Sequence, residues 1–297
     1  MDAQHDQHEP ARTSAPIMTV AEIERAVIEA SSQRARARAS APPTRNPLVL
    51  CLHNPLESFP QWAEGLAREI APVELATGID CLPRQLGGNT YGIFGPCTGR
   101  AFGTENQRPA VVLDLEQLAA DCGGLALSPT WLDNFCQYIE NAVALFLHEL
   151  AHVLSVEKEK MVALNVTEPA AREAVAACLR DPPDCEAAIP WQGHDARWIR
   201  TSCHLEARAT RLLGFEVQSF CVAGEYYGLS PAAAYRQALA DEPAQLAGEP
   251  FATIRQTRPP QALIDLWRAD LQAWWGRIST PSKSQALAME QGRTMFS

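Results

Sequence analysis

The stretch SPTWLDNFCQYIENAVALFLHELAHVLS, residues 128–155, decides how the rest of the chain is interpreted. Its large apolar side chains recur every three or four residues, which predicts one long amphipathic helix. Ser128 can cap the start of this helix, and Pro129 suits its first turn. The expected apolar stripe consists of Phe135, Ile139, Ala142, Val143, Phe146, Leu150 and Val153.

The end of this helix carries the segment HELAH, in which His148 and His152 are four residues apart and Glu149 follows the first histidine. Residues i and i+4 share one helix face, so both imidazoles can reach one metal ion, while the glutamate can hold a water beside it. Both histidines lie opposite the apolar stripe, which argues against core histidines. The alternative that remains is an exposed helix face with no ligand role.

A catalytic zinc site needs a third protein ligand and leaves one position for water. His194 follows a glycine at the start of another predicted helix, residues 195–213, from which its side chain can face a neighbouring helix. We therefore favour His194 as the third ligand. The alternatives are three carboxylates further along the chain, those of Glu168, Glu173 and Glu206.

The composition argues against several classes of function. The net charge of −10 arises in residues 46–240, which hold 13 Lys and Arg against 23 Asp and Glu, so a nucleic-acid partner is not expected. The chain has no apolar run long enough to cross a membrane, no signal-peptide pattern, and nine scattered cysteines typical of reduced thiols. We expect a cytoplasmic protein without membrane association.

The rest of the pattern predicts an α+β fold that is mostly helical with a small β-sheet. AVVLDL (110–115) is the clearest strand, and the glycine-rich stretch before it, residues 87–104, suggests a further strand or an irregular hairpin. Besides the two helices already described, the pattern predicts helices at residues 18–33, 58–72, 168–179, 230–240 and 259–275.

Three features together resemble the SprT-like zinc metalloproteases, a compact zincin family with a minigluzincin-like fold. They are HELAH, the later segment GHDARW (193–198), and the glycine-rich stretch that leads into AVVLDL. The resemblance covers about residues 60–215. It implies a zincin-like core with the HExxH motif on the central active-site helix. It also implies that AVVLDL is the edge strand beside the cleft, where an extended peptide can pair.

On this resemblance a Zn2+ ion is bound by His148, His152 and His194, and Glu149 is the catalytic base. The chain is then expected to divide into a flexible N-terminal segment with a short helix, a zincin-like metallopeptidase domain, a C-terminal helical extension and a flexible tail. The corresponding ranges are residues 1–47, 48–228, 229–278 and 279–297.

The function that follows is a zinc-dependent endopeptidase that hydrolyses peptide bonds of a protein or peptide substrate, with water activated by zinc and Glu149. Two alternatives stay open: a zinc-binding module that binds a protein partner without cleaving it, and a protease of narrow specificity that cuts one regulatory partner. The residues whose chemistry suits an oxyanion-stabilising role are His204, Arg208, Tyr226 and Tyr227.

Overall fold

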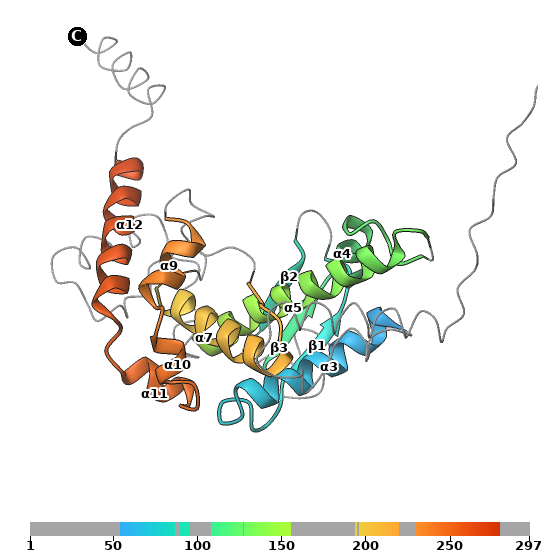
Figure 1. Ribbon diagram of the computed structural model, residues 1–297, viewed down its shortest axis with the longest axis horizontal. Helices are drawn as coiled ribbons and strands as arrows, with labels where there is room; N and C mark the ends of the chain where they lie inside the picture. Colours follow the sequence, from blue (N-terminus) through green and yellow to red (C-terminus); the bar gives the residue numbers. More distant parts are fainter. Residues whose placement is uncertain are drawn as a thin grey trace, which may run out of the picture.

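The computed structural model describes residues 54–86, 90–95, 108–126, 128–155, 194, 196–219 and 230–279. These residues form the expected mostly helical α+β structure with one three-stranded sheet (Figure 1). The helices predicted at 18–33 and 168–179 lie outside the described residues, as do the domain boundaries expected near 47 and 228. Within the described part of the chain, no helix is both long and apolar enough to cross a membrane.

The sheet has the order β1-β3-β2, with β1 at Asp80–Pro83, β2 at Gly92–Gly95 and β3 at Ala110–Leu113. β3 is hydrogen-bonded on both sides, because β1 pairs with it in parallel and β2 pairs with it in antiparallel orientation. The expectation that AVVLDL is the edge strand is therefore wrong. Among the described residues the antiparallel edge strand is β2, which lies within the predicted glycine-rich stretch.

β3 is also shorter than predicted, because the chain turns into a helix directly after Leu113. The Asp114 side chain accepts a hydrogen bond from the backbone N–H of Gln117 at 3.0 Å and so caps α4, Leu115–Asp121. Asp114 also accepts a bond from the backbone N–H of Leu86 at 2.8 Å, which ties the end of β3 to the segment after β1. One carboxylate thus ends the strand and begins the helix.

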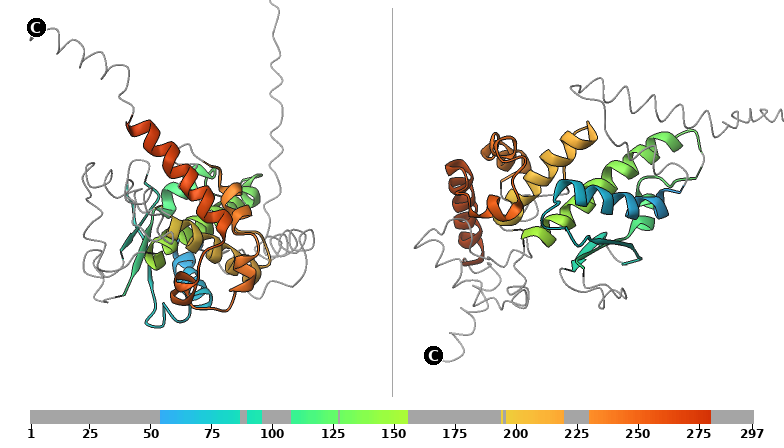
Figure 2. Two further views of the ribbon diagram at one scale, coloured as in Figure 1. Left: turned by 90° about the vertical axis from the view of Figure 1, so that its left-hand side faces the viewer. Right: turned by 90° about the horizontal axis from the view of Figure 1, so that it is seen from below.

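Helices α3 (Pro55–Ile70) and α5 (Trp131–Ser155) cover one face of the sheet, and α7 (Ala196–Leu213) packs along α5 (Figure 2). Helical spacing explains the contribution of α3, whose large apolar residues face the same core. From α3 the core receives Phe59, Trp62, Leu66 and Ile70, and from β3 it receives Val111 and Leu113.

α5 begins at Trp131, three residues later than predicted from Ser128. The backbone N–H of Trp131 donates to the carbonyl of Ser128 at 3.0 Å, so Ser128–Thr130 form a turn before the helix. The end of the helix at Ser155 agrees with the prediction. α7 also agrees closely, and it stops where Gly214 adopts a φ of 73°, the left-handed conformation that glycine tolerates best.

Among the described residues, four further helices gather at one end of α7, away from the sheet (Figure 1). They are α9 (Ala232–Ala238), α10 (Glu242–Gln245), α11 (Phe251–Gln256) and α12 (Gln261–Ser279). Arginines tie them to the rest of the core: among these, Arg200 of α7 binds Glu242 of α10, and Arg255 of α11 donates to the Leu154 carbonyl at 2.6 Å. The second bond satisfies a carbonyl in the last turn of α5.

Candidate metal centre

His148 and His152 lie one turn apart in the buried second half of α5. Their exposed fractions are 8% and 3%, because α7 packs over the face of α5 that carries them. The alternative of an exposed histidine face is therefore wrong. The histidines do lie opposite the apolar stripe, but that side of α5 is covered by a second helix, so the helix is buried on both sides.

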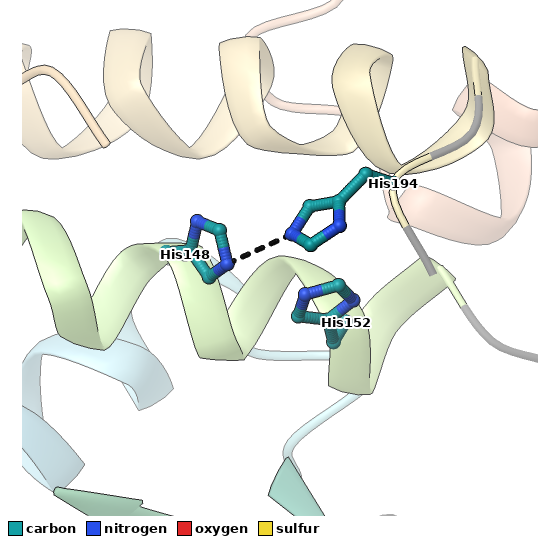
Figure 3. Close-up of side chains that lie close together, drawn as sticks. All are labelled: His148, His152 and His194. Carbon is teal, nitrogen blue, oxygen red and sulfur yellow. Dashed lines mark hydrogen bonds between the residues drawn. The ribbon is translucent and has the colours of Figure 1, made fainter. Parts of the chain in front are cut away.

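His194 approaches the two α5 histidines from the start of α7 (Figure 3). Its Nε2 atom lies 3.1 Å from Nε2 of His148, and one ligand nitrogen from each of the three imidazoles lies within 4.8 Å of the others. Two nitrogens bound at about 2.1 Å to one tetrahedral ion are separated by about 3.4 Å. The three side chains are close enough to bind a single metal ion.

The donor set is chemically suited to a transition metal. Imidazole nitrogens bind zinc and other late first-row metals, whereas calcium and magnesium prefer oxygen ligands. Three protein ligands leave a fourth tetrahedral position for water or substrate. In the part of the chain that the structure describes, no second cluster of His, Cys, Asp or Glu has this geometry.

Trp198, the last residue of the GHDARW segment, forms one wall of the centre, although the sequence analysis assigns it no role. Its ring centroid lies 4.8 Å from that of His148, 5.3 Å from that of His152 and 4.6 Å from that of His194. Its indole N–H donates to the backbone carbonyl of His148 at 3.3 Å, and the side chain is fully buried. The available signal was its position four residues after His194, in the first turn of α7.

Glu149 is buried beside the histidines, with an exposed fraction of 5%. Burial raises the pKa of its carboxyl group to about 8, because the ionised form loses its hydration. A cation held by the neighbouring imidazoles would favour the ionised form and so oppose this shift. The carboxylate also lies against the backbone of Gly92, the first residue of β2.

Of the three glutamates considered as alternative third ligands, the structure describes only Glu206, and this residue does not lie at the histidine cluster. Glu206 accepts hydrogen bonds from the backbone N–H of Ser219 at 2.5 Å and from Nε of Arg236 at 2.9 Å. It therefore anchors the segment after α7 and the helix α9, and it does not belong to the histidine cluster. Glu168 and Glu173 lie outside the described residues.

The described candidates for oxyanion stabilisation also serve the packing of the C-terminal helices. His204 is fully buried, with Nε2 3.6 Å from a carboxylate oxygen of Glu242. Arg208 donates to the Ile70 carbonyl at 2.7 Å and lies over the ring of Phe251 at 4.4 Å. Tyr226 and Tyr227 lie outside the described residues.

Searches of protein-family models, curated proteins and solved structures found no match to this chain.

Proposed function

We propose that the chain is a zinc-dependent metallopeptidase that hydrolyses peptide bonds of a protein or peptide substrate. The observation that supports this most directly is the convergence of three buried imidazoles within 4.8 Å, with the buried carboxylate of Glu149 next to His148 in the same helix. A purely structural zinc site is normally closed by a fourth protein ligand. The described residues supply three ligands together with a carboxylate of the type that accepts a proton from water.

In this proposal His148, His152 and His194 hold Zn2+, which when bound lowers the pKa of a water molecule and polarises the substrate carbonyl. Glu149 accepts the proton of the attacking water and passes it to the leaving amine. Trp198 excludes solvent from one side of the histidines and restrains the α5 backbone through its bond to the His148 carbonyl. The SprT-like, zincin-type assignment belongs to the same proposal.

The edge strand that would receive the substrate is β2. Within the described residues β2 pairs only with β3, and it packs against α5, the helix that carries Glu149. An unpaired strand edge can bind an extended peptide through backbone hydrogen bonds. In this proposal, the strand that pairs with an extended substrate is therefore Gly92–Gly95 and not AVVLDL.

The proposal is tested by comparing wild type with Glu149→Gln, and with Glu140→Gln as a matched control on the exposed side of α5. Zinc content would be measured by mass spectrometry, and cleavage would be followed on casein and on a peptide library. We expect all three proteins to retain zinc and only Glu149→Gln to lose cleavage. Equal cleavage by wild type and Glu149→Gln would contradict the proposal. Zinc binding with no cleavage of any substrate by wild type would favour the non-cleaving module.

A further inference from the structure

Gly92 lies so close to Glu149 that no side chain fits between them. A Cβ atom built on Gly92 would lie 2.6 Å from Oε1 of Glu149, 2.9 Å from its Cγ and 3.1 Å from its Cδ. Carbon atoms in contact are normally about 3.5–4.0 Å apart. The present position of the Glu149 side chain therefore requires a glycine at residue 92.

The strand register shows in which direction a side chain at residue 92 would point. Gly92 pairs with Leu113 in the antiparallel ladder, and paired residues direct their side chains to the same face of a sheet. Leu113 belongs to the hydrophobic core beneath α5, so a side chain at residue 92 would also point at α5. Glu149 occupies the space that this side chain would fill.

Backbone conformation does not account for the glycine. The described glycines with positive φ are Gly78, Gly123, Gly124 and Gly214, and Gly92 is not among them. An alanine could therefore adopt the backbone conformation of residue 92. The contact with Glu149 is what excludes it.

We propose that Gly92 is a positioning residue for the reaction, because its missing side chain seats the Glu149 carboxylate against the end of the edge strand. This inference rests on the proposed peptidase function. An added methyl group would be accommodated by rotating the whole Glu149 side chain about χ1, without unfolding β2, because Cγ as well as Oε1 lies too close to the added atom. The fold would then survive, but the carboxylate would move, and a displacement of about 1 Å at a reacting group can lower the rate about 100-fold.

The test is Gly92→Ala, with Gly248→Ala as a matched control, since a Cβ at Gly248 meets no atom within 4 Å. We expect Gly92→Ala to lower kcat about 100-fold with KM changed less than about threefold and zinc content unchanged. Gly248→Ala should match wild type in all three measurements. A Gly92→Ala enzyme with wild-type kcat would overturn the inference.

A crystal structure of Gly92→Ala gives a readout independent of activity, and it tests whether residue 92 seats the Glu149 carboxylate even if the wild type cleaves no peptide. The Glu149 carboxylate should be displaced from residue 92 while β2 keeps its pairing with β3. A carboxylate that stays in place while β2 moves would contradict the inference.

If Gly92→Ala alone does not fold, the inference is tested by thermal unfolding of the double variant Gly92→Ala/Glu149→Ala. Glu149→Ala removes the side-chain atoms that a Cβ at residue 92 would meet, so the double variant should have the same Tm as Glu149→Ala alone. A double variant that also fails to fold, or that unfolds well below Glu149→Ala, would show that another contact excludes the side chain and would overturn the inference.

Discussion

At the scale of single residues, the chemistry of the centre depends on which histidine completes it. His194 is buried beside the start of α7, and His204 is buried within that helix. Only His194 lies within ligand distance of His148 and His152. The two histidines are thus a natural pair for separating metal binding from packing.

We expect His194→Ala to lower zinc affinity by more than about 100-fold, because loss of even an indirect partner of a ligand costs about 10–100-fold. His204→Ala should keep its zinc affinity within about threefold and should instead destabilise the fold, because a fully buried side chain is removed. Competition with a chromogenic chelator measures the first effect and urea unfolding the second. Equal loss of zinc affinity in both variants would contradict the assignment of His194.

Glu149 provides a prediction on pH. Burial raises its pKa to about 8, whereas an exposed glutamate titrates near 4.3, so the metal-free folded protein binds more protons than the unfolded chain between these values. The stability of the metal-free protein should therefore fall as the pH rises through this window. Glu149→Gln stays neutral, and its Tm should exceed that of wild type at pH 9, with a smaller difference at pH 5.

Differential scanning calorimetry of the metal-free proteins measures this difference. Glu140→Gln changes an exposed carboxylate of the same helix and should follow wild type across the pH range. Added zinc should reduce the difference at pH 9, because a nearby cation stabilises the ionised carboxylate. A Tm difference that does not change with pH would contradict the raised pKa of Glu149.

At the scale of elements, the attachment of α10 to α7 depends on a buried ion pair. Nε of Arg200 donates to both carboxylate oxygens of Glu242, at 3.1 and 3.2 Å, and Nη1 of Arg200 donates to the Thr257 carbonyl at 2.9 Å. Burial by itself would raise the pKa of Glu242, but His204 and Arg200 outweigh it, and the net pKa is lowered. The pair therefore contributes stability above the ordinary pKa of a glutamate, and that contribution is lost as the pH falls through the lowered pKa.

Glu242→Gln should destabilise the protein by about 3–5 kcal/mol, because it leaves the buried guanidinium of Arg200 without its countercharge. The control is Asp265→Asn, which breaks an exposed pair with Arg268 on α12 and should cost no more than about 0.5 kcal/mol. Urea unfolding at pH 7 measures both values. Equal and small effects of the two substitutions would show that α10 is held by apolar packing alone.

The sequence pattern predicts all the long elements and some short ones, such as β3 and α9, but it misses four short elements for a physical reason. α5 and α7 span several turns, so their apolar period is visible, and the i, i+4 spacing identifies His148 and His152. β1, α4, α10 and α11 have seven residues or fewer, too few to show a clear period. The central position of β3 depends on its pairing with β1, a contact between distant segments that no local pattern encodes.

The same distinction applies to the centre. Glu149 and the two α5 histidines follow from one helical turn, so they are predictable from the sequence. The approach of His194 depends on how α7 packs along α5, which no local pattern encodes. Its position after a glycine at the start of a predicted helix made His194 the favoured candidate, with the three glutamates as alternatives. Trp198 and Gly92 acquire their roles entirely from tertiary contacts, with the His148 carbonyl and the Glu149 carboxylate respectively.

At the scale of the whole molecule, a metal bound by these histidines would link the two helices at the middle of the fold. Two ligands lie on α5 and the third lies at the start of α7, so the site exists only when these helices are packed together. A ligand that binds the folded state and not the unfolded chain stabilises it by about 4 kcal/mol at 1,000 times its Kd. For a folded region of this size, this corresponds to a rise in Tm of about 8–16 °C.

We therefore expect chelation of zinc to lower the Tm of wild type by about 8–16 °C, and stoichiometric zinc to restore it. His194→Ala should lose most of this zinc-dependent shift, whereas His204→Ala should keep it from a lower starting Tm, because its packing defect does not remove a ligand. Scanning fluorimetry with and without chelator measures all three proteins. If wild type binds one zinc ion tightly without any change in Tm, the ion does not join α5 to α7, and the three-histidine centre must be rejected.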